Sequence, residues 1–367
     1  MNIEIGIIGL SQSGRTAVFK ALTGSETGGD GHGREGAAHL GVARVADPRL
    51  DTLTAMLHPK KTVAVSIAYI DVGASVKGLV EGQSIGGRLL AQLSRVDALI
   101  VVIRDFADDS VPHPDGSVDV ARDIAAMDLE LAFSDLAIIE RRQERVETSL
   151  KAATPAERQA FLREQEALAG LRRGLEKDVP AREQGLTAEE VRLVSNFQLL
   201  TAKPLLVAVN IGEAGLPEAA SLERQLNDSH SRPGRRVVVL CGKLEMELAQ
   251  LDEETATSWR QEFGLTESGA ERIVGASYNL MGLVTFFSTA SDEVRAWPIP
   301  RGTAAPAAAG RIHSDMERGF IRAEVVGYDD LVACGSLAEA RHRGLLRTEG
   351  RNYLVADGDV ITFLFNV

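Results

Sequence analysis

A glycine-rich loop near the beginning of the chain decides its fold: Gly9-Leu10-Ser11-Gln12-Ser13-Gly14-Arg15-Thr16. It follows an apolar run, residues 3–10, of the kind that forms a buried parallel strand, and a helical pattern continues beyond it through Leu22. The spacing of Gly9, Gly14 and Thr16 matches a phosphate-binding P-loop, with arginine instead of lysine at position 15. We therefore predict a nucleotide-phosphate site here.

The backbone chemistry of such a loop does not depend on the lysine. Successive N–H groups at a helix N-terminus surround an anion, and the helix dipole adds to the attraction. Arg15 keeps the positive charge, although guanidinium is planar and forked rather than compact. A plain glycine turn is the alternative, whereas a dinucleotide fold is disfavoured because Gly-x-Gly-x-x-Gly is absent. The candidate phosphate-binding residues are Gly9, Ser11, Gln12, Ser13, Gly14, Arg15, Thr16 and Ala17.

Further apolar runs extend the pattern along the chain. They cover residues 64–70, 98–103, 205–209 and 237–240, and helix-like segments separate most of them. Strands that alternate with helices imply a mostly parallel sheet covered on both faces. We therefore predict an α/β fold whose P-loop domain comprises residues 1–124 and 203–284.

Two segments depart from this alternation. Residues 125–202 are mostly helical in pattern: Thr154-Pro155-Ala156-Glu157 has the signature of a helix start, and Phe161, Leu168 and Leu175 follow at seven-residue spacing. An inserted arm of two antiparallel coiled-coil helices fits this pattern, and a helical layer on the main domain is the alternative. Residues 285–367 contain short alternating segments and predict a separate α+β domain.

Composition limits the possible partners. The 367 residues include 40 basic and 52 acidic side chains, a formal net charge of −12, which argues against a global electrostatic grip on nucleic acid or anionic membrane. Most of the acidic excess lies in the P-loop domain, so local RNA contact elsewhere stays open. The two cysteines exclude a disulfide scaffold, and no apolar run is long enough to span a membrane. We expect a cytoplasmic protein, monomeric and without a membrane partner.

Three polar motifs follow successive predicted strands. Asp71 stands where P-loop NTPases hold Mg²⁺ through water, with the Thr16 hydroxyl as a direct ligand, so we predict a Mg²⁺ site formed by Thr16 and Asp71. Asn210-Ile211-Gly212-Glu213 stands where Asn-Lys-x-Asp reads guanine in GTPases, and Cys241-Gly242-Lys243 stands where a base-contacting loop would lie. The candidate base-binding residues are therefore Asn210, Glu213, Cys241, Gly242 and Lys243.

With these motifs the chain resembles the Obg-like ATPases of the YchF subfamily, within the translation-factor-related P-loop GTPases. The resemblance extends nearly end to end. Besides the loops, it rests on Asp47-Pro48-Arg49-Leu50, Gly116-Ser117-Val118-Asp119, Glu293-Val294-Arg295-Ala296-Trp297, Gly319-Phe320-Ile321-Arg322-Ala323-Glu324-Val325 and Phe365-Asn366-Val367.

The resemblance implies a G domain, an inserted coiled-coil arm and a C-terminal TGS domain with a β-grasp-like fold. It also implies that ATP is preferred over GTP, because the family carries Asn-x-x-Glu, which Asn210 and Glu213 match. Family members are associated with ribosomes and translation, so the arm and the TGS domain are expected to contact the ribosome or RNA.

The family's phosphate-sensing residues are altered in this chain. Arg15 replaces the P-loop lysine, Ala74 replaces the glycine that faces the γ-phosphate, and Glu35 stands near the position of a Mg²⁺-sensing threonine. No catalytic residue can be named. We therefore expect an ATP-binding protein with weak, slow or absent hydrolysis. The alternative is a pseudo-NTPase that docks the ribosome, RNA or a protein without a nucleotide cycle.

Overall fold

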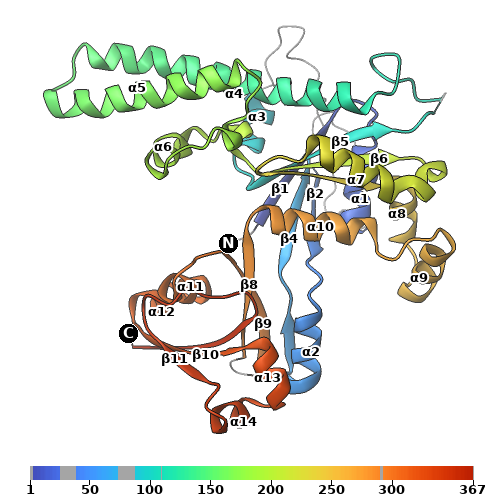
Figure 1. Ribbon diagram of the computed structural model, residues 1–367, viewed down its shortest axis with the longest axis vertical. Coiled ribbons are helices and arrows are strands. Elements are labelled where there is room, and N and C mark those ends of the chain that lie inside the picture. The colour runs from blue at the N-terminus through green and yellow to red at the C-terminus, as the bar shows by residue number, and fades with distance from the viewer. Residues whose placement is uncertain (1–2, 25–38, 73–86, 109, 290–291, 367) are drawn as a thin grey trace. The chain divides into compact units, whose positions relative to one another are not determined.

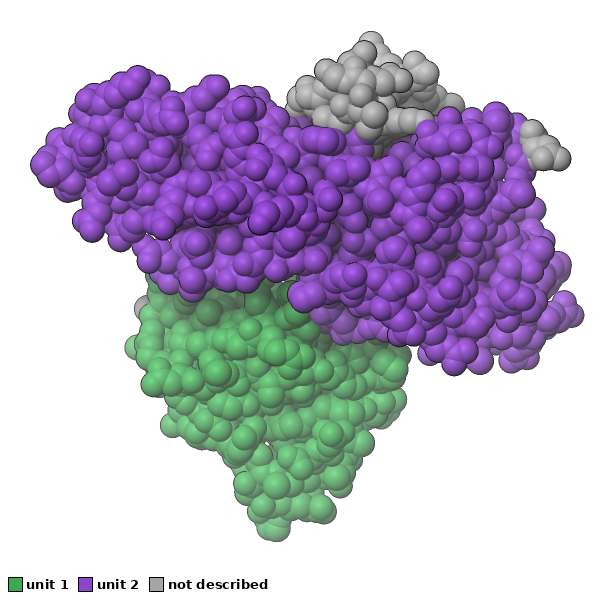
Figure 2. Space-filling view, turned by 45° about the horizontal axis from the view of Figure 1, so that its top comes forward, with its two compact units in different colours: residues 1–2, 44–67, 281–367 green, residues 3–43, 68–280 purple. Residues whose placement is uncertain are grey.

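The computed structural model describes residues 3–24, 39–72, 87–108, 110–289 and 292–366. These residues form two compact units (Figure 2). The first unit, which the key of Figure 2 shows in purple as unit 2, comprises residues 3–43 and 68–280. The second unit, which the key shows in green as unit 1, comprises residues 44–67 and the chain from residue 281 onward. Residues 44–67, which the sequence analysis places with the P-loop domain, thus cluster with the C-terminal residues.

A six-stranded sheet forms the centre of the first unit (Figure 1). Its strands lie in the order β2 (His39–Arg44), β4 (Ser66–Asp71), β1 (Ile3–Gly9), β5 (Ala98–Asp105), β6 (Leu205–Ile211) and β7 (Arg235–Leu240). Strands β1, β5, β6 and β7 pair in parallel. Every residue of β6 is buried, as expected for a strand covered on both faces. The predicted α/β fold is confirmed.

Helices connect these strands or follow the last of them along the chain. They are α1 (Arg15–Thr23), α3 (Gly87–Leu93), α7 (Ala219–His230), α8 (Gly242–Leu248), α9 (Glu253–Glu262) and α10 (Gly269–Leu280). The main core joins the strand residues Val101 and Val207 to Met127 and Leu131 of the long helix α4 (Val120–Leu150). The central sheet therefore holds the beginning of α4 in place.

Helix α4 continues past this core and packs against α5 (Pro155–Leu175); the two lie side by side in Figure 1. Ile139 and Val146 of α4 meet Leu168 and Leu171 of α5 in a separate buried cluster. The predicted helix start is confirmed, because the Thr154 N–H donates to the Glu157 carboxylate over 3.0 Å in a capping box. The coiled-coil geometry stays a prediction.

A buried carboxylate ties α4 to the segment that follows α5. This segment contains η1 (Ala181–Glu183), α6 (Ala188–Val194), η2 (Ser195–Phe197) and η3 (Leu200–Ala202). Asp135 of α4 accepts bonds from the Leu200 N–H, the Thr201 N–H and the Thr201 hydroxyl, at 2.8, 2.8 and 2.6 Å. Burial nevertheless raises the pKa of Asp135 to about 6, because it disfavours the charged form more than these bonds favour it.

This raised pKa predicts a pH-dependent contribution to stability. Between the unfolded pKa and about pH 6 the folded state binds the extra proton, so the contribution is present below the unfolded pKa and is lost as the pH rises through about 6. The side chain of Asp135→Asn does not titrate, so the effect of this substitution on the free energy of unfolding of the variant itself does not change with pH. In urea unfolding, the free energy of unfolding of the variant minus that of wild type should therefore increase by up to about 3 kcal/mol between pH 4 and 7. A pH-independent difference would contradict this.

The second unit contains its own six-stranded sheet, in the order β11 (Arg347–Glu349), β10 (Phe320–Gly327), β12 (Asp359–Phe365), β8 (Leu283–Ser288), β9 (Glu293–Pro300) and β3 (Lys61–Val63). Its helices are α2 (Pro48–Leu57), α11 (Ala305–Ile312), α12 (Ser314–Arg318), α13 (Tyr328–Cys334) and α14 (Leu337–His342). Phe286, Phe320 and Phe363 pack together in its core. The unit is α+β in character, and its assignment as a TGS domain stays a prediction.

Arg49 explains why α2 belongs to this second unit. Its guanidinium bonds both Asp47 and Asp357, at 2.8 and 2.9 Å, and lies over the ring of Phe287. These bonds raise the pKa of Arg49 above its ordinary value. Strand β3 adds a second tie, because it pairs in parallel with β9.

Among the described helices of the chain, none combines the length and apolarity needed to cross a membrane.

Candidate nucleotide-phosphate site

The glycine-rich loop lies between β1 and α1, and two glycines are required by its geometry. Gly14 has a φ of 83°, a left-handed conformation that disfavours side chains. A Cβ there would lie 2.1 Å from Nδ2 of Asn210, and a Cβ on Gly9 would lie 2.7 Å from the carbonyl oxygen of Val102. The backbone therefore passes too close to its neighbours for any other residue at these two positions.

Residues 10–17 line a hollow of ≈ 330 Å³ at the beginning of α1. No side chain caps this helix, and its first turn contains no acidic residue. The N–H groups of a first turn have no partners within the helix, and their partial positive charge favours an anion. The predicted phosphate-binding residues thus lie together around a space that suits a phosphate group.

Arg15 and Thr16, by contrast, both contact Asp71 at the end of β4. Nε of Arg15 lies 2.6 Å from Oδ1 of Asp71, and the Thr16 hydroxyl donates to Oδ2 over 3.3 Å. The Asp71 side chain is only 2% exposed and that of Arg15 is 15% exposed. The structure therefore brings the two predicted Mg²⁺ residues together, and it adds a cation that the sequence analysis assigned to phosphate.

This arrangement does not fit a hydrated Mg²⁺ ion at Asp71. Mg²⁺ demands near-octahedral oxygen ligands and keeps several waters, so it needs carboxylate oxygens that face open space. Here the guanidinium of Arg15 takes one oxygen of Asp71, and Thr16 takes the other. The geometry therefore argues against the Mg²⁺ site that the sequence predicts at Thr16 and Asp71.

Asn210 holds the glycine-rich loop to the beginning of α8, directly after β7. Its Nδ2 donates to the Ser13 carbonyl over 3.0 Å, and its Oδ1 accepts from the Gly242 N–H at 2.8 Å. The side chain is buried, and a Cβ on Gly242 would lie 3.0 Å from its Oδ1. Asn210 therefore sets the distance between two of the predicted nucleotide-binding segments, a role that its sequence position did not reveal.

The other predicted base-binding residues separate into a surface pair and a core residue. Glu213 and Lys243 form an exposed ion pair of 2.9 Å beside the loop, and Glu213 raises the pKa of Lys243. The Cys241 side chain is buried in the main core, and burial raises the pKa of its thiol. Only the backbone of Cys241 is thus placed to serve a ligand.

Phe106, directly after β5, is a candidate that the sequence analysis missed. A Cβ on Gly14 would lie 3.9 Å from Cε1 of Phe106, and one on Gly212 would lie 3.4 Å from its Cβ. Phe106 therefore lies between the glycine-rich loop and the backbone at Gly212, directly after β6. Buried Arg104 holds it: its Nε donates to the Phe106 carbonyl over 2.9 Å, and its guanidinium lies over the ring. An aromatic residue at the end of a buried strand was the available signal.

Two of the altered residues, Glu35 and Ala74, lie outside the described residues. Within the described part of the chain, His113, Asp115 and Asp123 have the spacing of metal ligands. Asp123, however, already contacts His113 and Arg122, both at 2.9 Å. This cluster is explained by internal pairing at the beginning of α4.

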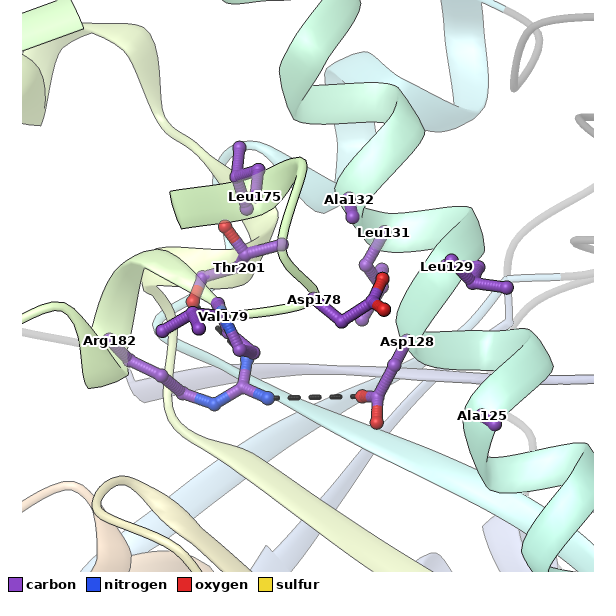
Figure 3. A pocket seen from close by; sticks show the side chains of 11 residues that line it. Ala125, Asp128, Leu129, Leu131, Ala132, Leu175, Asp178, Val179, Arg182 and Thr201 are labelled. Atoms are coloured by element: carbon purple, nitrogen blue, oxygen red, sulfur yellow. Dashed lines mark hydrogen bonds and ion pairs between the residues drawn. The ribbon is translucent and has the colours of Figure 1, made fainter. Parts of the chain in front are cut away.

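A second hollow, of ≈ 210 Å³, lies where α4 meets the segment after α5 (Figure 3). Figure 3 shows Arg182 facing Asp128 across it; their nearest atoms are 3.9 Å apart, and Glu183 lies at the same distance from Nε of Arg182. Burial lowers the pKa of Arg182. Because two carboxylates already flank this guanidinium, the hollow offers little attraction to a phosphate, unlike the one at α1.

Comparisons with known proteins find relatives that match the whole chain. Residues 283–366 match the family model YchF-GTPase_C, described as a protein of unknown function (DUF933). The chain is 38% identical to the ribosome-binding ATPase YchF of Bacillus subtilis and 35% identical to that of Escherichia coli O157:H7, with 100% of each chain covered. The solved structure of the Schizosaccharomyces pombe YchF GTPase matches 99% of this chain over 98% of its own length, with a TM-score of 0.81 and 28% sequence identity.

Proposed function

This chain belongs to the YchF family, and we propose that it binds adenine nucleotide at the glycine-rich loop, associates with the ribosome and hydrolyses ATP weakly or slowly. The observation that carries this proposal is the uncapped beginning of α1 around a ≈ 330 Å³ hollow, because it provides N–H donors for a phosphate. GTP is the second nucleotide to consider, since the Schizosaccharomyces pombe neighbour is named a GTPase.

The assignment of ATP and the ribosome rests on relatives whose printed names describe a ribosome-binding ATPase. Glu213, which occupies the place of the guanine-reading aspartate, supports adenine, because its carboxylate is already paired with Lys243. We further propose the arm and the C-terminal unit as the surfaces that meet ribosomal RNA or protein, and the cytoplasm as the location.

We propose that weak hydrolysis follows from the position of Arg15. In P-loop NTPases the corresponding lysine contacts the β- and γ-phosphates and neutralises charge that develops there. Here the guanidinium is paired with Asp71. Phosphate release at saturating ATP should therefore be far slower than from the Bacillus subtilis relative measured alongside, and Arg15→Lys should raise it. Equal rates for the two proteins would refute this part of the proposal.

We propose Phe106 as the surface on which the base stacks. A base that stacks on an aromatic side chain gains roughly 1–3 kcal/mol. Phe106→Ala should therefore weaken ATP binding about tenfold, by about 1.4 kcal/mol. Phe106→Tyr retains the ring and should bind like wild type. Titration of fluorescent ATP would measure both, and an unchanged affinity of Phe106→Ala would remove Phe106 from the site.

A pseudo-NTPase that docks its partner without a nucleotide cycle is the second candidate. The Arg15–Asp71 pair favours it, since the pair engages two residues that hydrolysis would use. Ribosome association that is the same with and without ATP would support this second candidate. Association that depends on ATP would support the first.

A further inference from the structure

The Arg15–Asp71 pair occupies the place at which P-loop proteins hold a metal ion. Such sites contain two positive groups, a lysine and a Mg²⁺ ion held by a hydroxyl and an acidic residue. In this chain the hydroxyl is that of Thr16 and the acidic residue is Asp71, and the two lie 3.3 Å apart. The inference that follows rests on the proposed function, because it concerns how nucleotide binds at this loop.

The charges at this position are balanced without an ion. The Asp71 carboxylate is 2% exposed, and the guanidinium of Arg15 reaches it at 2.6 Å. A divalent ion that entered here would have to displace the guanidinium or lie beside it. If the ion displaced the guanidinium, it would break an ion pair that is mostly shielded from water, which is costly. If the ion lay beside the guanidinium, two positive charges would lie within a few ångströms of each other. Both routes oppose Mg²⁺ at Asp71.

The phosphate-binding part of the loop does not need the metal. The beginning of α1 supplies backbone N–H donors, and its end of the helix carries partial positive charge. Arg15 is the first residue of this helix, so its charge lies at the same end of the hollow. Arg15 thus cancels the charge of Asp71, which would otherwise repel the phosphates, and the backbone donors of the loop remain available.

We propose that Arg15 is a built-in cation that takes the place of Mg²⁺, so that this chain binds nucleotide phosphates in their metal-free form. Arginine suits this role better than lysine because it stays charged and its planar fork matches a carboxylate. Arginine in place of lysine at position 15 would thus impair hydrolysis and still preserve nucleotide binding. A protein of this kind would hold nucleotide under conditions in which Mg²⁺-dependent relatives release it.

Calorimetric titration of ATP into the full chain, once with Mg²⁺ and once with EDTA, tests this directly. We expect the two dissociation constants to agree within about threefold, whereas the Bacillus subtilis relative should lose at least about tenfold in EDTA. A loss of tenfold or more for this chain would overturn the inference and leave the proposed function intact. No binding in either buffer would overturn both.

Variants identify the cation. Arg15→Ala should lose about tenfold in EDTA and recover part of this with Mg²⁺, because Asp71 becomes open to the ion. Arg15→Lys keeps a positive charge at this position and should also become Mg²⁺-dependent, which guards against misfolding of the alanine variant. Lys20→Ala removes an exposed charge from the same helix and should match wild type. Arg15 variants that bind ATP like wild type in EDTA would refute the role of Arg15.

Discussion

Alanine at position 14 should remove measurable nucleotide binding. The new Cβ of Gly14→Ala would lie 2.1 Å from Nδ2 of Asn210, and that amide cannot swing away because it is bonded to both Ser13 and Gly242. The φ of 83° adds about 1–2 kcal/mol of strain for any residue with a side chain. We expect the affinity for ATP to fall more than about 100-fold, or about 2.7 kcal/mol, in a calorimetric titration.

Gly264→Ala is the matched control for this variant. Gly264 also has a positive φ, of 70°, but no atom lies within 4 Å of the Cβ it would gain. It should therefore lose about 1–2 kcal/mol of stability and bind ATP like wild type. The account would be contradicted by a folded Gly14→Ala protein whose affinity for ATP is unchanged, or by equal losses of affinity in the two variants.

Asn210→Ala should have the second-largest effect, on stability and on binding together. It leaves the Ser13 carbonyl and the Gly242 N–H without their side-chain partner in a buried place. Each unsatisfied buried group costs about 1–3 kcal/mol, so the loss of two partners should destabilise the protein by about 2–6 kcal/mol in urea unfolding. Because the two loops are then no longer joined, the affinity for ATP should fall by about tenfold or more.

Asn227→Ala separates these two effects. The Asn227 side chain also bridges two backbone groups, since it bonds both the N–H and the carbonyl of Val237, but it joins α7 to β7 rather than two loops at the site. The Asn227→Ala protein should lose stability as the Asn210→Ala protein does, but it should still bind ATP like wild type. A loss of affinity as large as that of Asn210→Ala would show that the effect comes from general loosening.

Patterns over short stretches of sequence predicted most of the first unit correctly. The apolar runs form the buried strands β1, β5, β6 and β7, and the glycine-rich segment forms a loop between a strand and a helix. The Thr154–Glu157 signature became a capping box. In each case the deciding interactions lie between residues that are close along the chain, so a local pattern contains the necessary information.

Contacts between distant segments could not be predicted in this way. The partner of Arg15 depends on where β4 places Asp71, and nothing in the loop itself distinguishes an arginine that meets phosphate from one that meets a carboxylate. Asn210 was assigned to the base because it follows the apolar run 205–209, whereas its bonds to Ser13 and Gly242 exist only once β6 meets the glycine-rich loop and the beginning of α8. The pairing of β3 with β9 likewise joins segments far apart in sequence.

The central claim is that the loop from Gly9 to Ala17 binds nucleotide, and calorimetric titration of the full chain with ATP tests it most directly. We predict one binding site per chain, with ADP also bound, GTP weaker, and no site in Gly14→Ala. No heat of binding at millimolar ATP, with or without Mg²⁺, or binding that is unaffected in a folded Gly14→Ala protein, would contradict the claim.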